Sequence, residues 1–151
     1  MSNEIPGVCH GLLPGQQLPE QTFVVTRADL VRYAGAAGDF NPIHYSERIA
    51  RAAGLPGVVA HGMFTMALGA RAVHAWVDAA VTVLEYNVRF AKPVIVPDDE
   101  TGVRVMVSGT VKSVAEDGST LIMLTVTSND QKVLSQARAT VRQNNDRIHH
   151  G

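Results

Sequence analysis

Cysteine is almost absent from this sequence, because Cys9 is the only one among 151 residues. A single cysteine cannot form a disulfide within the chain, and it excludes a metal cluster built from several cysteine ligands. Such sparing use of cysteine favours a reducing compartment. The stretch from Met1 to Gln16 also lacks the basic and apolar regions of a secretory signal peptide. We therefore expect a cytoplasmic protein.

An excess of charge of one sign is also lacking. Thirteen Lys and Arg residues face fourteen Asp and Glu residues, and the formal net charge is −1. This balance gives no basic surface of the kind that binds nucleic acid or an anionic membrane. The longest apolar stretch, Met63 to Val77, is interrupted by Arg71 and His74 and is too short to span a bilayer. We expect neither nucleic acid nor a membrane as a partner.

Hydrophobic residues, by contrast, make up 46% of the chain, which is enough for a packed core. The length suits one compact domain. We expect a leading loop over residues 1–18, where Gly, Pro and Gln are frequent, and a single domain over residues 19–142. A frayed polar tail is expected over residues 143–151.

The first half of the domain has the pattern of one strand followed by helices. Gln21 to Thr26 is typical of a short strand, and Thr26 offers an N-cap for a helix that ends near Gly38. Ser46 caps a second short helix. From His61 to Asp78 the residues are apolar almost all round, which predicts a long helix buried at the centre of the fold.

From Val81 onward, apolar residues alternate with polar ones, which predicts four strands separated by acidic or Gly-containing turns. An antiparallel meander is the simplest arrangement of these strands. The chain is thus predicted to be an α+β domain, in which a curved, mainly antiparallel sheet wraps a long central helix.

The segment YAGAAGDFNPIH holds the side chains best suited to chemistry. Asp39 and His44 lie five positions apart across a turn containing a proline, and Asn41 lies between them. A loop with this spacing can direct both side chains into one cavity, where a carboxylate and an imidazole can share proton transfers.

The run G-D-x-N-P-x-H resembles the signature of the MaoC-like (R)-specific enoyl-thioester hydratases and dehydratases. AHGM at residues 60–63 and YNVRFAKPV at residues 86–94 resemble the start of that family's central helix and the strand that follows it. The resemblance covers residues 13–141 and is closest to the catalytic subunit of actinobacterial 3-hydroxyacyl-ACP dehydratases of the mycolic-acid or fatty-acid type. The residues that match the run are Gly38, Asp39, Asn41, Pro42 and His44.

The resemblance implies a single hot-dog fold and a hydro-lyase that converts (3R)-3-hydroxyacyl thioesters and trans-2-enoyl thioesters into one another. It implies that Asp39 and His44 are the acid/base pair and that Asn41 orients the pair or the reacting water. The backbone N–H of Gly62 is the implied oxyanion donor. Which member of the pair handles the C2 proton stays open, and the mechanism implies no metal and no cofactor.

Three further residues are weaker candidates for substrate binding, and each also has a plainer explanation. His61 can instead bond local backbone at the start of the helix. Met63 lies at helical spacing and can be ordinary core. Arg89, with Lys92, can meet the phosphates of a carrier, but a solvated strand face explains both residues equally simply.

Two rival functions compete with the lyase, a hot-dog acyl thioesterase and a non-catalytic acyl-binding subunit of a heteromeric dehydratase. The intact set of Asp39, Asn41 and His44 favours the lyase. The expected partners are an acyl thioester of coenzyme A or acyl carrier protein and a second hot-dog subunit, because a lone sheet leaves an edge unpaired. The carrier, the acyl-chain length, the direction in fatty-acid or polyketide-type metabolism and the identity of the second subunit stay open.

Overall fold

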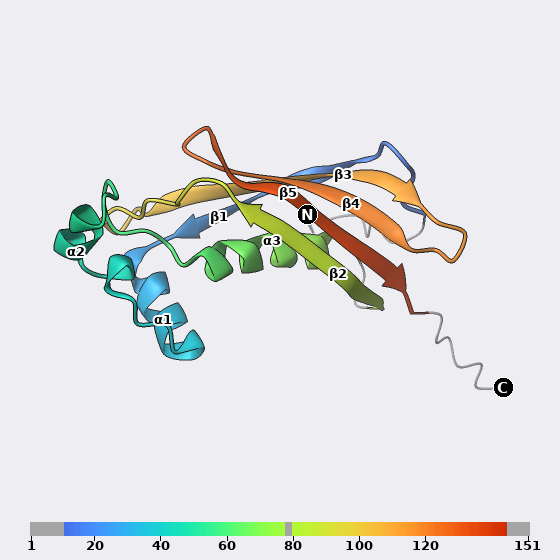
Figure 1. Ribbon diagram of the computed structural model, residues 1–151. Helices are drawn as coiled ribbons and strands as arrows, with labels where there is room; N and C mark the ends of the chain where they lie inside the picture. The colour runs from blue at the N-terminus through green and yellow to red at the C-terminus, as the bar shows by residue number, and fades with distance from the viewer. Residues whose placement is uncertain (1–10, 78–79, 145–151) are drawn as a thin grey trace, which may run out of the picture.

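The computed structural model describes residues 11–77 and 80–144. Its five strands form one antiparallel sheet in the order β1-β3-β4-β5-β2, and this sheet curves over helix α3 (Figure 1). Cys9 lies outside the described residues. The elements are β1 (Gln17–Val25), α1 (Arg27–Ala37), η1 (Pro42–His44), α2 (Glu47–Ala52), α3 (Gly62–Trp76), β2 (Val81–Phe90), β3 (Val103–Val114), β4 (Thr120–Ser128) and β5 (Gln131–Gln143).

Helix α3 lies under the concave face of the sheet, as predicted for the central helix. At its last turn the ring of Trp76 packs against Gly109 of β3, where a side chain would leave no room. The indole Nε1 of Trp76 donates to the carbonyl oxygen of Pro19 at 2.7 Å. The residues buried on this face recur at helical spacing: Thr65, Leu68, Gly69, Ala72, Val73 and Trp76.

The predicted burial of this helix is only partial in the single chain. One face of α3 is exposed, and it carries Met63, Ala67, Arg71 and His74 at helical spacing. Only one side of α3 lies against the concave face of the sheet, so the opposite side of the helix is left open in the single chain.

The predicted meander of four strands was correct only for β3, β4 and β5. Strand β2 pairs with β5 at one edge, and β1 pairs with β3 at the other. The reason is the long connection over residues 91–102, which pairs with the segment before α3 instead of turning back tightly. In that pairing Ala60 N–H donates to the Val94 carbonyl and Val96 N–H donates to the Val58 carbonyl, both at 2.9 Å.

The ends of the sheet reach slightly beyond the predicted domain boundaries. Gln17 and Leu18 were assigned to the leading loop, but they pair with β3, and the Leu18 side chain is buried in the core. Burial of this side chain favours an earlier start for β1. Likewise, β5 ends at Gln143, one residue beyond the predicted end of the domain at residue 142.

Helix α1 leads into residues 38–44, which we call the motif loop, and the predicted caps of this helix are confirmed. Thr26 and Asp29 form a reciprocal capping box, in which Thr26 N–H donates to the Asp29 carboxylate at 2.8 Å. This backbone bond lowers the pKa of Asp29. Gly38 ends the helix with φ of 70°, a left-handed conformation that favours glycine. The turn at Gly38 therefore determines where Asp39 lies relative to the end of α1.

Among the described residues, no helix is both long enough and apolar enough to cross a bilayer.

Candidate active site

A cavity of about 330 Å³ opens at the N-terminal end of α3. We call it the catalytic cavity, because we propose below that the reaction takes place there. Its lining is mostly apolar, with few polar groups, as is usual for small-molecule sites. Residues far apart in the sequence meet in it: Ile43, His44, Val59, Ala60, Gly62, Thr65, Phe90, Ala91, Lys92, Pro93, Val94, Val133 and Leu134.

The His44 imidazole is buried at the edge of this cavity, where η1 ends. Its Nδ1 lies 2.7 Å from the carbonyl oxygen of Val59. A carbonyl oxygen can only accept, so Nδ1 must carry the proton. The neutral ring then has its lone pair on Nε2, and His44 is poised to accept a proton at that atom.

The Asp39 carboxylate is half exposed and lies beside His44. One oxygen, Oδ1, accepts from the backbone N–H of Asn41 at 3.2 Å. The other, Oδ2, lies 4.0 Å from Nε2 of His44. This gap is too long for a direct hydrogen bond but suits a water or a substrate hydroxyl that bonds to both atoms. We call Asp39 and His44 the catalytic pair, after the role that we propose for them below.

Asn41 shapes the loop that carries this pair. Its Oδ1 accepts from the backbone N–H of Ile43 at 3.2 Å and caps η1. Together with the bond between Asn41 N–H and Asp39, this makes two consecutive side-chain turns. The structure therefore brings Asn41 next to the pair, but the contact of its side-chain oxygen is with the loop.

Gly62 is the first residue of α3, and it lines the catalytic cavity with His44. Within the part of the chain that the structure describes, no side chain caps this end of the helix. Its first N–H groups and the positive end of the helix dipole therefore face the cavity. The Phe90 ring packs over Gly62 so closely that a Cβ there would lie 3.1 Å from the ring. Sequence reasoning missed Phe90, because only the fold brings β2 against the start of α3.

The His61 side chain lies behind the catalytic pair, with only 1% of its surface exposed. Its Nε2 lies 3.1 Å from the backbone oxygen of Asp39. The His61 ring stacks on His44 with centroids 3.8 Å apart and planes at 23°, and Tyr33 packs beside it at 4.7 Å. Burial lowers the pKa of His61, although the bond to the backbone of Asp39 opposes this shift. His61 is therefore a neutral imidazole at neutral pH.

Met63 and Arg89, the other two weak candidates for substrate binding, are exposed. Neither is among the described residues that line the catalytic cavity, and nor is His61. Lys92, which was paired with Arg89 as a contact for a carrier, does line it. A substrate-binding role for His61, Met63 and Arg89 stays a prediction.

Asp39, His44 and His61 offer potential metal-ligand atoms within 4.8 Å of one another. The lone pairs of an imidazole lie in the plane of its ring, and the two rings here are stacked in nearly parallel planes. One ion cannot lie in both planes at bonding distance. The arrangement suits proton transfer better than metal binding.

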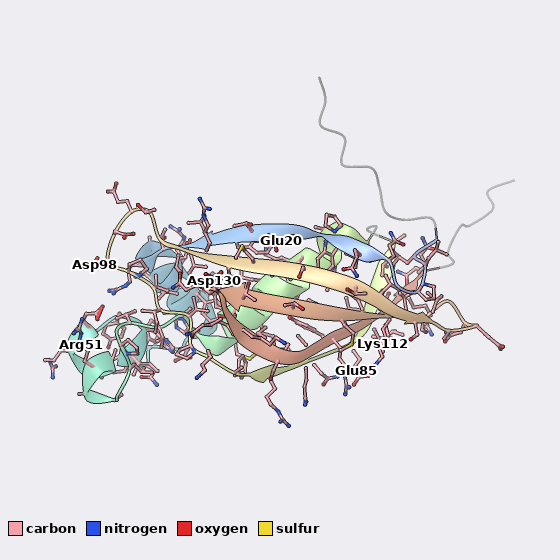
Figure 2. The ribbon with its side chains drawn as sticks, turned by 90° about the horizontal axis from the view of Figure 1, so that it is seen from above. Glu20, Arg51, Glu85, Asp98, Lys112 and Asp130 are labelled. Atoms are coloured by element: carbon pink, nitrogen blue, oxygen red, sulfur yellow. The ribbon has the colours of Figure 1, made fainter. Side chains whose placement is uncertain are left out.

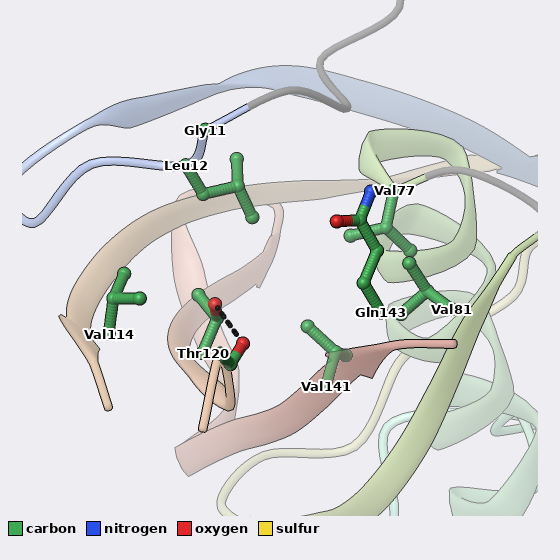
Figure 3. A pocket seen from close by; sticks show the side chains of 9 residues that line it. Gly11, Leu12, Val77, Val81, Val114, Thr120, Val141 and Gln143 are labelled. Atoms are coloured by element: carbon green, nitrogen blue, oxygen red, sulfur yellow. Dashed lines mark hydrogen bonds between the residues drawn. The ribbon is translucent and has the colours of Figure 1, made fainter. Parts of the chain in front are cut away.

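A second cavity, of about 190 Å³, lies beside the last turn of α3 and is lined mainly by valine and leucine side chains (Figure 3). None of its described lining residues ionises near neutral pH, so it offers no acid or base. The chemistry of the described chain is therefore concentrated at the other end of α3. The lining residues are Gly11, Leu12, Val77, Val81, Val114, Gly118, Thr120, Val141 and Gln143.

Residues 12–130 match the family described as MaoC like domain. Over 79 residues the chain is 44% identical to 3-hydroxyacyl-thioester dehydratase X of Mycobacterium tuberculosis (strain ATCC 25618 / H37Rv), a match that covers 52% of this chain and 27% of that protein. The chain spans at most 49% of the length of the curated relatives it matches.

Solved structures confirm the predicted hot-dog fold. A MaoC-like dehydratase superposes with a TM-score of 0.81 and 39% identity, covering 87% of this chain and 41% of that one. The R-hydratase PhaJ1 from Pseudomonas aeruginosa, in its unliganded form, superposes with a TM-score of 0.74 and 25% identity, covering 87% and 82%.

Proposed function

The chain belongs to the MaoC-like domain family, and on that premise we propose that it is a hydro-lyase acting on acyl thioesters. The proposed reaction adds water to a trans-2-enoyl thioester to give the (3R)-3-hydroxyacyl thioester, or runs in reverse. One observation carries the proposal: Asp39 Oδ2 and His44 Nε2 lie 4.0 Å apart, beside a cavity that the first residue of α3 also lines.

The catalytic pair supplies the proton transfers. With Asp39 ionised and His44 neutral, both facing atoms accept hydrogen bonds, so they hold a water molecule through its two O–H groups. During hydration the pair takes one proton from this water as the hydroxyl bonds to C3, and it returns one proton to C2. Dehydration removes the C2 proton and releases the C3 hydroxyl, with that proton, as water.

The thioester carbonyl gains negative charge in both directions, and we assign Gly62 as its oxyanion donor. The Gly62 N–H lies at the uncapped, positive end of a helix of 15 residues. The missing side chain lets the carbonyl oxygen approach the backbone. Phe90, which packs against Gly62, then forms one wall of the acyl site.

The two rival functions have less support. A thioesterase needs a water aimed at the carbonyl carbon, but the pair is arranged to hold one water between two acceptors. A non-catalytic subunit can lose the acid/base pair, but this chain keeps both Asp39 and His44. The relative with 44% identity bears the name of a dehydratase, which agrees with the lyase.

We also propose that the chain pairs with a second hot-dog subunit through β2. The sheet ends in β1 on one side and β2 on the other, where Figure 2 labels Glu20 and Glu85. Strand β1 carries Pro19, and a proline discourages pairing at a free edge. Strand β2 has ten residues and no proline. We further propose that Lys92, which lines the cavity, offers its positive charge to a phosphate of the carrier. We also propose that the reaction takes place in the cytoplasm.

The test follows the loss of enoyl-thioester absorbance with crotonyl and longer trans-2-enoyl groups, each on coenzyme A and on acyl carrier protein. We expect wild type to form the 3R product. Asp39→Asn and His44→Ala should each lower kcat/KM by about 10²–10⁴-fold, the usual contribution of general acid–base catalysis. Asp98→Asn and His74→Ala are matched controls, since both residues are exposed and neither lines the catalytic cavity.

A saturated acyl thioester separates the rival enzyme from the lyase, because only a thioesterase releases thiol from it. Thiol release from butyryl-CoA without hydration of any enoyl thioester would overturn the proposed function. Equal activity of wild type and the two pair variants would overturn the assignment of the pair.

A further inference from the structure

We propose that His61 is a positioning residue, which holds both members of the catalytic pair in place without reacting itself. This inference rests on the proposed function and adds a residue to it. His61 contacts Asp39 and His44 simultaneously, and it directly precedes the oxyanion donor Gly62.

The contact with Asp39 fixes the loop. The backbone oxygen of Asp39 can only accept, so Nε2 of His61 carries the proton and donates to it at 3.1 Å. This bond ties the motif loop to the start of α3, twenty-two positions along the chain. It sets the distance from the Asp39 carboxylate to the cavity, because the backbone of the same residue is held.

The contact with His44 fixes the ring. Val59 anchors the His44 imidazole only at Nδ1, which leaves the ring free to swing about that bond. The stacked His61 ring, 3.8 Å away, blocks this motion on one face. Nε2 of His44 therefore stays directed at Asp39 Oδ2.

The position of His61 is itself fixed from the other side. Tyr33 of α1 packs against its ring at 4.7 Å and also against Phe64 at 5.2 Å. The His61 side chain is nearly fully buried, and among the described residues its Nδ1 has no hydrogen-bond partner. A buried imidazole whose one hydrogen bond goes to the backbone of Asp39 can hold its neighbours in position but does not exchange protons with solvent.

Two substitutions separate the two contacts. His61→Phe keeps an aromatic ring against His44 but removes the N–H donor, while His61→Gln keeps a donor and removes the ring. We expect kcat of His61→Phe to fall by about 10–100-fold with KM changed by less than about twofold, because small misplacements cost that much in catalysis. His61→Gln should recover part of kcat by restoring the bond to Asp39.

His74→Phe and His74→Gln are the matched controls, because His74 lies on the exposed face of the same helix. They should keep wild-type kcat. A wild-type kcat in His61→Phe would overturn the proposal. It would also be overturned if the two His61 variants lost the same fraction of kcat and the same number of degrees in melting temperature.

A measurement on wild type keeps the proposal testable if a His61 variant fails to fold. Nitrogen-15 NMR of the imidazoles at pH 7 should find His61 protonated at Nε2 and bare at Nδ1. The opposite tautomer, or a doubly protonated ring, would overturn the proposal. Failure of the proposed function is recognised separately, because wild type would then hydrate none of the four enoyl thioesters.

Discussion

Two histidines in ring contact have different chemistry at the residue scale, because their hydrogen bonds differ. His44 donates through Nδ1 to Val59 and presents a bare Nε2 to Asp39. His61 donates through Nε2 to the Asp39 backbone and is buried more deeply. These contacts support the roles that we propose, a proton acceptor for His44 and a fixed support for His61.

Burial of His61 predicts a pH dependence of stability. Its pKa is lowered in the folded protein, so below about pH 6.5 the unfolded chain binds the extra proton more readily. Stability is therefore fully present above that pH and is lost as the pH falls toward the folded pKa. Between pH 7 and pH 5, wild type should therefore lose more free energy of unfolding than His61→Gln.

Urea unfolding of both proteins at pH 7, 6 and 5 measures this difference. The other titrating groups are present in both chains, and those that His61 does not contact cancel in the comparison. Parallel pH profiles for the two proteins would contradict the prediction.

Much of the site follows from its residues alone, since the spacing of Asp39 and His44 across Pro42 predicted that they meet. The sequence does not reveal that His61 bonds to Asp39, because they lie twenty-two positions apart and the bond is to backbone. Nor does it reveal Phe90 over Gly62, which depends on how β2 packs. Contacts within a loop can be predicted from spacing, but contacts between elements require the fold.

At the scale of elements, two helices each contain a glycine in very different surroundings. Gly35 in α1 is exposed, and an added methyl would meet no atom within 4 Å. Gly69 in α3 is buried under the Tyr86 hydroxyl, which donates to the Met66 carbonyl at 2.7 Å. Burial raises the pKa of Tyr86 to about 12.

The same substitution should therefore have opposite effects in the two helices. Gly35→Ala should raise the free energy of unfolding by about 0.5–1 kcal/mol, because alanine favours the helix and finds open space. Gly69→Ala should lower it by about 1–3 kcal/mol, because the methyl displaces the Tyr86 hydroxyl and breaks its bond to α3. Thermal and urea unfolding measure both changes, and equal signs would contradict the packing of Tyr86.

Local signals predicted the elements better than their order. Thr26, Ser46 and Gly38 cap helices where expected, because capping depends on bonds to adjacent backbone. The place of β2 beside β5 was not predicted, since it depends on the path of residues 91–102 around the fold. Alternation of apolar residues identifies a strand but does not name its neighbour.

At the scale of the whole molecule, substitutions on the two edge strands of the sheet should affect the dimer differently. Leu84 of β2 and Val24 of β1 are both exposed hydrophobic residues on edge strands. If β2 is the contact between subunits, Leu84→Lys should weaken the dimer by at least about tenfold, because it places a charge in an apolar interface. Val24→Lys should leave the dimer intact.

Analytical ultracentrifugation over a range of concentrations measures the dissociation constant for wild type and both variants. A monomeric Val24→Lys with a dimeric Leu84→Lys would assign the contact to β1 instead.

The chain contains one tryptophan, Trp76, whose indole is sealed between Pro19 and Gly109 at the last turn of α3. The catalytic cavity opens at the first turn, roughly 20 Å away along a helix of this length. The fluorescence of Trp76 therefore reports whether the core around it is intact, and a ligand in the catalytic cavity should not change it. Unfolding can thus be followed by the fluorescence of Trp76, and the substrate by the absorbance of the enoyl thioester, in one sample and without an added label.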